Sequence, residues 1–129
     1  MKQIYRADKR GNLTEILKGM KAPKLLMLMS NAKQFEEHVQ ELENHFPGVP
    51  SIGCIGGSYG GQEVVAENGV AVIAMEGNLT VATNVLEQAS TMPVKYIGRL
   101  EADINKVGAS EKNTVCIDFC TGNDACVLT

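Results

Sequence analysis

A glycine-rich stretch around a single cysteine is the part of the sequence best suited to chemistry. It reads "SIGCIGGSYGGQEV" over residues 51–64 and carries Cys54 near its start. Glycine-rich loops hold phosphates when a helix follows directly, because free N–H groups at the helix N-terminus bind the anion. Here the loop leads into an apolar segment with the pattern of a strand, and no Lys-Ser/Thr pair is present. The sequence therefore argues against a nucleotide site.

Cys54 leaves two interpretations open. A nucleophilic cysteine needs a base and nearby positive charge to form the thiolate. The two histidines are His38 and His45. We place His38 on the polar face of a predicted helix and His45 at that helix's end, where it could approach the loop or simply be solvated. Cys54 is then either the nucleophile of an enzyme or a small apolar side chain at the end of a strand.

The other cysteines, Cys116, Cys120 and Cys126, have the spacing C-x3-C-x5-C. This spacing matches neither a zinc knuckle nor the common iron–sulfur pattern. We predict no metal, no cofactor, and four reduced thiols. We also predict that Cys116 and Cys120 share one face of a final strand and that Asp118 faces away from both. Asp118 is then either solvated or a ligand contact at the strand's end.

The composition limits the class of protein. The chain has 129 residues, of which 44% are hydrophobic and 21% charged, as expected for one soluble domain. Its net charge of −3, without a large basic cluster, argues against a nucleic-acid partner. The N-terminus lacks the apolar segment of a secretory signal, and the aliphatic run at 25–29 is far shorter than a membrane span. We therefore predict a cytoplasmic protein with no membrane partner.

Hydrophobic patterning predicts the elements before the loop. Residues 2–6 form a strand, and a helix begins at Asn12 with Glu15 completing a capping box. Residues 24–30 are apolar on both faces, which is typical of a central strand. The apolar stripe of the first helix consists of Leu13, Ile16, Leu17 and Met20.

The helix at 31–46 has the clearest periodicity, and Ser30 or Asn31 caps it. A strand over 49–55 follows and delivers the chain into the glycine loop. The apolar positions of the helix are Ala32, Phe35, Val39, Leu42 and Phe46. We predict that Phe35, Val39 and Leu42 pack on the sheet, and that Glu36, Glu37 and Gln40 stay exposed.

After the loop the pattern becomes antiparallel. Asn68-Gly69 predicts a hairpin between 62–67 and 70–76, and a third strand at 79–86 completes a meander. A helix over 91–107, with Gly108 as its C-cap, and a strand at 113–120 follow. The fold class is therefore α/β, with a mixed β-sheet that has a parallel crossover part and an antiparallel meander, flanked by helices.

Several of these segments together resemble one known family. A helix like 31–46, the link "PGVP", the strand "IGC", a glycine turn ending in "GQEV" and a hairpin are similar to the N-terminal FIST domain, over roughly residues 20–120. That family shows a segment G-C-S/T-x-x-G-E-I. The resemblance carries over Gly53 and Cys54 directly, and Gly61 and Glu63 less directly. Ile55 stands where the family has a hydroxyl, and "GGSYG" lengthens the loop, so Ser58 is a candidate to replace that hydroxyl.

The family is a bacterial sensory module that precedes signalling outputs such as chemoreceptor or cyclase domains. The resemblance thus implies a small-molecule ligand such as an amino acid, a C-terminal output domain as partner, and no catalytic residues. It also implies that residues 1–129 are a single α/β domain, the N-terminal part of a longer sensory domain. The alternatives are an enzyme that uses Cys54 and a protein-interaction module that uses the edge strand of the meander.

The predicted ligand site follows the glycine loop. We expect the glycines at 56, 57, 60 and 61 to take positive φ, so that unpaired N–H groups face a carboxylate or carbonyl. A glycine bend that only connects two strands is the competing interpretation. The predicted site residues are Gly53, Cys54, Gly56, Gly57, Ser58, Tyr59, Gly60, Gly61, Glu63 and Asp118.

Overall fold

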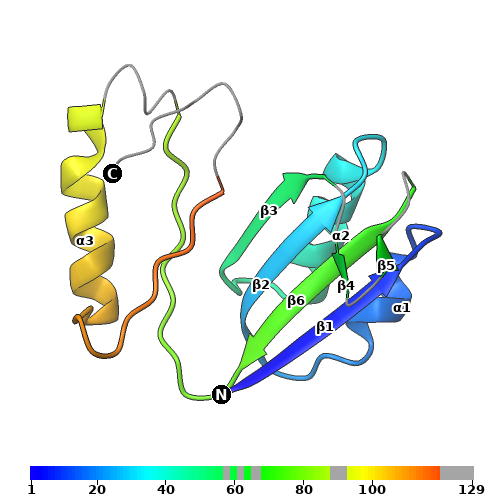
Figure 1. The fold of residues 1–129 in the computed structure, drawn as a ribbon, viewed down its shortest axis with the longest axis horizontal. Helices are drawn as coiled ribbons and strands as arrows, with labels where there is room; N and C mark the ends of the chain where they lie inside the picture. Colours follow the sequence, from blue (N-terminus) through cyan, green and yellow to red (C-terminus); the bar gives the residue numbers. More distant parts are fainter. Residues whose placement is uncertain (57–58, 61–62, 65–67, 88–92, 120–129) are drawn as a thin grey trace. The chain divides into compact units, whose positions relative to one another are not determined.

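The computed structural model describes residues 1–56, 59–60, 63–64, 68–87 and 93–119 (Figure 1). The chain divides into two compact units, Met1–Val81 and Ala82–Thr129, and each is described by itself. None of the helices in the described part of the chain combines the length and apolar character needed to cross a lipid bilayer.

A four-stranded mixed sheet forms the centre of the first unit. It consists of β1 (Lys2–Asp8), β2 (Pro23–Ser30), β3 (Ser51–Ile55) and β6 (Val70–Glu76), in the order β1-β6-β2-β3. β2 and β3 are parallel neighbours, whereas β6 runs antiparallel to both β1 and β2. The prediction of an α/β fold with a mixed sheet is confirmed, and so is the interior position of β2.

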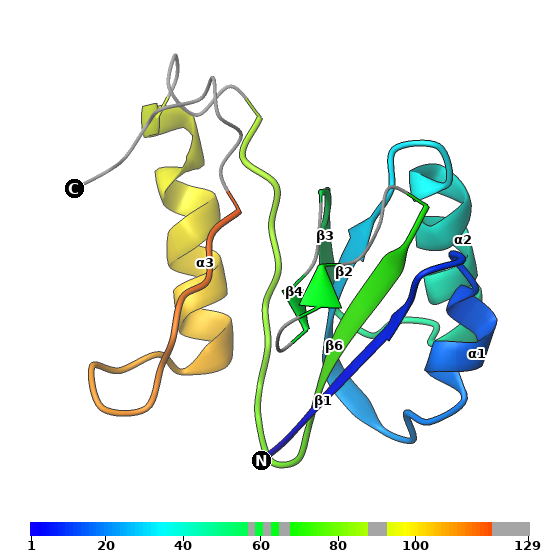
Figure 2. The ribbon, with the colours of Figure 1, turned by 45° about the vertical axis from the view of Figure 1, so that its right-hand side comes forward.

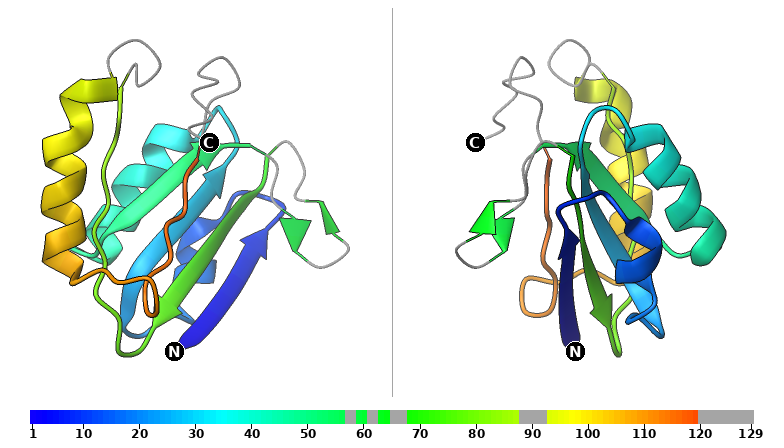
Figure 3. Two further views of the ribbon diagram at one scale, coloured as in Figure 1. Left: turned by 60° about the vertical axis from the view of Figure 1, so that its left-hand side comes forward. Right: turned by 90° about the vertical axis from the view of Figure 1, so that its right-hand side faces the viewer.

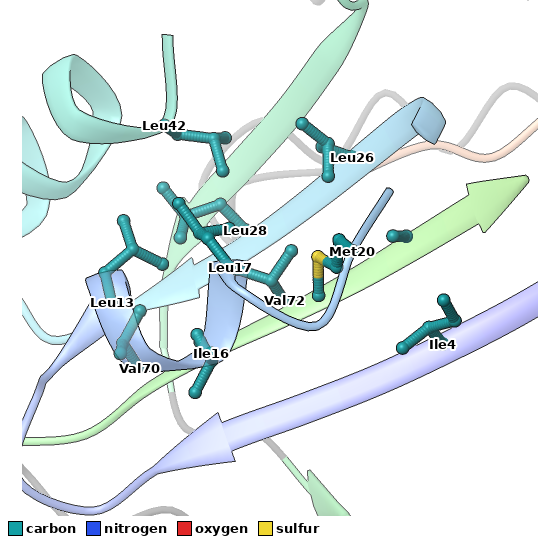
Figure 4. Packing of buried hydrophobic residues seen from close by; sticks show 11 residues of the cluster. Ile4, Leu13, Ile16, Leu17, Met20, Leu26, Leu28, Leu42, Val70 and Val72 are labelled. Carbon is teal, nitrogen blue, oxygen red and sulfur yellow. The ribbon is translucent and has the colours of Figure 1, made fainter. Parts of the chain in front are cut away.

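Two helices, α1 (Leu13–Leu17) and α2 (Phe35–His45), cover one face of this sheet (Figures 1 and 2). The four predicted apolar positions of the first helix are all 7% exposed or less, so that stripe is confirmed. Figure 4 shows how these side chains meet those of the strands. The buried cluster consists of Ile4, Leu13, Ile16, Leu17, Met20, Leu26, Leu28, Leu42, Val70, Val72 and Ala74.

The predicted capping box of α1 is half formed. The Glu15 backbone N–H donates to Asn12 Oδ1 at 3.3 Å, as predicted. The reciprocal bond is replaced, because the Asn12 N–H donates to Asp8 Oδ1 at 3.1 Å. The Glu15 carboxylate instead pairs with Lys18 one turn later, at 2.5 Å.

The buried face of α2 is rotated from the predicted one. Leu42 is buried and Phe35 partly buried, but Val39 is 40% exposed, so its predicted packing is wrong. His38, predicted on the polar face, is only 1% exposed. The predicted exposure of Glu36, Glu37 and Gln40 is confirmed. Asn31 caps the turn before the helix, since its Oδ1 accepts the Gln34 N–H at 3.0 Å.

The predicted hairpin across Asn68-Gly69 is wrong. β5 (Glu63–Val64) pairs with β4 (Tyr59–Gly60) in a separate two-stranded sheet. β6 has both its edges occupied by the longer strands β1 and β2, which leaves no free edge for residues 63–64. Figure 3 shows β4 and β5 on the side of the main sheet opposite α1 and α2. The predicted strand residues 65–67 lie outside the described residues.

The second unit contains a helix and extended segments. A 3₁₀ turn, η1 (Pro93–Tyr96), leads into α3 (Ile97–Val107), and Gly108 ends it with φ 61°. The helix and its C-cap are confirmed, while Thr91 and Met92 lie outside the described residues. The predicted strands are wrong over 79–86 and over the described residues 114–119, which form no ladder.

Hydrogen bonds with side chains of α3 help to explain why residues 84–85 form no strand. Arg99 donates to the Val85 carbonyl at 3.1 Å, and the Asn84 amide donates to Asp103 Oδ2 at 2.7 Å. The bond from Arg99 satisfies a backbone carbonyl that a neighbouring strand would otherwise satisfy.

Candidate ligand-binding edge of the sheet

The glycine loop leaves the sheet where β2 and β3 both end. Ser30 and Ile55 are register partners at the carboxyl ends of these parallel strands. The next residue, Gly56, donates its N–H to the Ser30 carbonyl at 3.1 Å. In α/β proteins, ligands bind outside the carboxyl ends of parallel strands. The loop therefore begins at the edge where a ligand is most expected.

Gly53 and Gly56, the two described glycines before the loop's centre, differ in the space available for a side chain. A Cβ on Gly53 would lie 3.1 Å from the Leu28 carbonyl oxygen and 3.2 Å from Leu28 Cβ, so a side chain there is tight. A Cβ on Gly56 would meet nothing within 4 Å. The φ of Gly56 is outside the left-handed region and its N–H is paired, so the predicted positive φ and free N–H are wrong at this position.

Cys54 is a free, partly buried thiol on β3. It is the register partner of Met29, which is opposite Ala71 on β6. Ile55, at the position of the family's hydroxyl, is 58% exposed at the strand's end. In β4 and β5, Gly60 is paired with Glu63 and Tyr59 with Val64. Gly57, Ser58 and Gly61 lie outside the described residues.

A buried polar network, which the sequence analysis missed, lies beneath this edge. The hydroxyl of Ser30 is 2.7 Å from Nδ1 of His38, and both side chains are almost fully buried. Nε2 of His38 is 2.9 Å from the carbonyl oxygen of Gly11. A carbonyl only accepts, so Nε2 carries the proton. In the neutral imidazole Nδ1, at 2.7 Å, accepts the one Ser30 hydroxyl proton in preference to the Asn31 carbonyl oxygen, which lies 3.1 Å from the same hydroxyl. The geometry thus assigns the tautomer of His38.

Asn31 extends the network to the turn before β6. Its Nδ2 donates to the Gly69 carbonyl at 3.2 Å and to Gln34 Oε1 at 3.1 Å. Gly11 has φ 78°, and an added Cβ would be 2.7 Å from the Asn68 carbonyl oxygen, so glycine is required there. The network therefore ties the start of α1, the end of β2, the start of α2 and the start of β6 to one another.

A signal for the burial of His38 was present in the sequence. His38 is three residues after Phe35 and four before Leu42, which is the spacing of a buried helical stripe. Because histidine is a polar residue, the prediction placed His38 on the solvent-exposed face of the helix. Its two hydrogen-bond partners come from distant segments, and helical periodicity does not report such partners.

The histidines give Cys54 no base among the described residues. Both ring nitrogens of His38 are bonded to Ser30 and Gly11. His45 lies at the opposite end of α2, where its ring packs edge-on against Phe46 at 4.6 Å between centroids. A crossover helix runs antiparallel to the strands it connects, so His45 lies toward the start of β3, away from the glycine loop.

Asp118 belongs to the second unit and is exposed. Its Oδ1 is 3.7 Å from Sγ of Cys116, so the prediction that these side chains face apart is wrong. Positions two apart in an extended chain share a side. Burial raises the pKa of the Cys116 thiol, and the Asp118 carboxylate raises that pKa further, which lowers the thiolate population. Cys120 and Cys126 lie outside the described residues.

Within the described ranges, no group of three or more histidine, cysteine or acidic side chains could hold a metal ion. The contribution of Asp118 to a ligand site stays a prediction.

A family model matches the part of the chain that includes this edge. The model of the FIST N domain matches residues 24–128, which is most of the chain. The chain belongs to the FIST N family. FIST domains are sensory modules of signal transduction, so a general sensory role follows. The match includes β2, α2, β3 and the glycine loop, whereas β1 and Gly11 precede it. Searches of curated proteins and of solved structures found no match.

Proposed function

We propose that this FIST domain is a cytoplasmic input module that binds a small ligand at the edge formed by the carboxyl ends of β2 and β3. One observation carries the proposal: the glycine loop begins at this edge, and Gly56 anchors it to Ser30. The space around the Gly56 Cα is open, so a ligand can approach the backbone closely there.

The chemistry of the loop favours a ligand with a carboxylate or carbonyl group. Successive backbone N–H groups in a glycine-rich loop can donate hydrogen bonds to an anion. Ser58 and Tyr59 supply hydroxyl groups, and Glu63 supplies a carboxylate that can pair with an amino group. A free amino acid has both charged ends and therefore suits this set.

The buried network supports binding by holding the edge in place. The bond between Ser30 and His38 joins the end of β2 to α2, and the bond between His38 and Gly11 joins segments 27 residues apart in sequence. A site held by its scaffold loses less conformational entropy when it binds a ligand. The edge beneath the loop is thus suited to a sensor that binds small molecules.

A C-terminal output domain, such as a chemoreceptor or cyclase module, would read the binding event. Binding shifts such an output only through a difference in affinity between two states of the domain. We propose no enzymatic function, since both ring nitrogens of His38 are occupied and His45 lies at the other end of α2. The meander edge that an interaction module would use is not formed by residues 79–86.

Gly56→Ala tests the proposal. A Cβ fits at this position without a clash and without a left-handed φ, so we expect the free energy of unfolding to change by at most about 0.5 kcal/mol. We expect calorimetric binding of an amino acid to weaken about tenfold or more, because the methyl group occupies the ligand's approach.

Gly98→Ala is the matched control. It also has open space around its Cα, and it lies within α3. This change should raise stability by up to about 1 kcal/mol and leave affinity unchanged. Equal affinities of wild type and Gly56→Ala would contradict the proposed location of the site.

A further inference from the structure

β3 is an outer strand of the main sheet, and the side of it that faces away from β2 is unpaired. The strand order is β1-β6-β2-β3, so β2 is the neighbour of β3 within the sheet (Figure 1). None of the described residues forms a ladder with the other side of β3, which we call its free edge. Such an edge presents backbone N–H and C=O groups that can pair with another strand.

The hydrogen bonds to β2 show which backbone groups point to the free edge. The Pro50 carbonyl accepts the Leu26 N–H at 3.0 Å, and the Gly56 N–H donates to the Ser30 carbonyl at 3.1 Å. The backbone groups of Pro50 and Gly56 thus face β2. This direction alternates along a strand, so the even-numbered residues of β3 face β2 and the odd-numbered ones face outward. The outward groups belong to Ser51, Gly53 and Ile55.

The free edge of β3 is exposed and carries no charge. All three residues with outward groups are exposed, and Ile55 is 58% exposed. Proteins often protect an outer strand by charged side chains or by a covering element. β1, the other outer strand, carries Lys2, Arg6 and Asp8 and has β4 beside it, whereas residues 51–55 include no charged side chain. This difference between the two outer strands indicates that the free edge of β3 is a pairing surface.

The outward groups are arranged symmetrically about Gly53. When a second copy runs antiparallel with its Gly53 opposite the first, Ser51 of each copy is opposite Ile55 of the other. Residues whose backbone groups face each other in an antiparallel ladder exchange both N–H···O=C bonds, so this register pairs every outward group of both strands. Because β3 is uncharged, the two copies bring no like charges together. The edge is therefore complementary to itself.

We propose that the protein forms a symmetric dimer in which β3 pairs antiparallel with β3 of a second copy. The two four-stranded sheets then continue into one another. The exposed Ile55 side chain lies beside Ser51 of the second copy. Each glycine loop begins beside the Pro50 end of the neighbouring strand, because antiparallel strands place opposite ends together. The dimer does not depend on the proposed ligand.

Amide hydrogen exchange followed by NMR tests the proposal residue by residue. In dilute protein, where the dimer dissociates, the amides of Ser51, Gly53 and Ile55 should exchange rapidly, and in concentrated protein they should be protected. The amides of Ile52 and Cys54, which face β2, should be protected at both concentrations. Over the same range the mass from analytical ultracentrifugation should rise from 13.9 kDa to twice that value.

Ile55→Lys tests the free edge by mutation. Lysine on an outer strand opposes pairing, so we expect the dissociation constant of the dimer to rise about tenfold or more. Ile55 is exposed, so the variant should keep the circular dichroism spectrum of the wild-type monomer. Val39→Lys is the matched control, because Val39 is a 40% exposed apolar residue on α2. It adds the same charge outside β3 and should leave the dissociation constant unchanged.

Ile52→Cys tests the register. In the proposed dimer residue 52 is opposite Cys54 of the second copy in a non-hydrogen-bonded pair, with Cα atoms about 4.5 Å apart. That separation permits a disulfide, and Cys54 is a free thiol. Mild oxidation should therefore link the variant into a covalent dimer through residues 52 and 54, as peptide mapping by mass spectrometry would identify. Wild type and Val39→Cys should form far less of this species.

Three results would overturn the proposal. One is a monomer at every concentration with rapid exchange along the free edge. Another is protection of the outward amides in the monomer, since another part of the chain would then occupy the edge. The third is a dimer that Ile55→Lys leaves intact and that Ile52→Cys does not link, because such a dimer uses another surface. None of these results bears on ligand binding at the glycine loop.

Discussion

Replacing Ser30 by alanine tests whether the buried network beneath the glycine loop has the geometry described. Ser30 is 0% exposed and His38 is 1% exposed, so water does not replace the lost hydroxyl. Nε2 of His38 donates to Gly11, which leaves Nδ1 as an acceptor whose donor is the Ser30 hydroxyl. Ser30→Ala removes that donor and leaves a buried acceptor unpaired.

The expected loss in the free energy of unfolding is about 1–3 kcal/mol, the cost of leaving one buried polar group without a partner. Urea unfolding followed by circular dichroism measures this loss. The slope of the free energy of unfolding against urea concentration should stay the same as in wild type. Ser51→Ala is the control, because Ser51 is an exposed serine at the start of β3 in the same sheet. That change should stay within about 0.5 kcal/mol of wild type.

A double-mutant cycle isolates the contact from other effects of the substitution. In a His38→Phe background no acceptor remains at Nδ1, so Ser30→Ala should then cost much less than in wild type. The coupling between the two sites should be about 0.5–3 kcal/mol. Equal losses for Ser30→Ala and Ser51→Ala, or the same loss in both backgrounds, would refute the network.

Two further predictions concern packing and pH. Leu42→Ala should lower the free energy of unfolding by about 2–5 kcal/mol, because Leu42 is buried. Val39→Ala, at a 40% exposed position of the same helix, should lower it far less. Equal losses would mean that the buried face of the helix is assigned wrongly. Backbone N–H groups of Ala22 and Lys21 donate to Glu76 and hold the pKa of its carboxyl below the ordinary 4.5. The stabilisation is thus present above about pH 4.5 and disappears as pH falls through the lower folded-state pKa. Melting temperatures of wild type and Glu76→Gln should therefore differ at neutral pH and converge in acid, and a constant gap would contradict this.

The elements with strong local patterns could be predicted from the sequence. α1 was found from its cap and stripe, and β2 from an uninterrupted apolar run that only a central strand tolerates. The glycine loop was placed after a strand, and the structure puts it at the carboxyl end of β3. These features depend on neighbours within a few residues, so the sequence carries them directly.

Strand pairing could not be predicted in the same way. Asn68-Gly69 is a strong hairpin signal, yet β6 pairs along seven residues with β1 and also with β2. Burial of a strand that is apolar on both faces outweighs the local preference of a turn. The pairing partners come from residues 2–8 and 23–30, and no local pattern identifies them.

His38 shows the same limit at the candidate site. Its spacing fitted a buried stripe, but its burial is favourable only because Ser30 and Gly11 supply hydrogen bonds. The positive φ predicted at Gly56 failed for a related reason. The Ser30 carbonyl accepts the Gly56 N–H, so this N–H is paired within the protein, and the bend at Gly56 forms without a left-handed φ.

We propose that a small ligand binds at the glycine loop on the edge formed by β2 and β3. The most direct measurement is amide shift mapping by two-dimensional NMR on this 13.9 kDa chain during titration with L-leucine. We expect the largest saturable shifts on residues 53–63, while the amides of α3 from Ile97 to Val107 stay in place. Saturable shifts confined to α3, or no saturable shifts with any amino acid, would contradict this proposal.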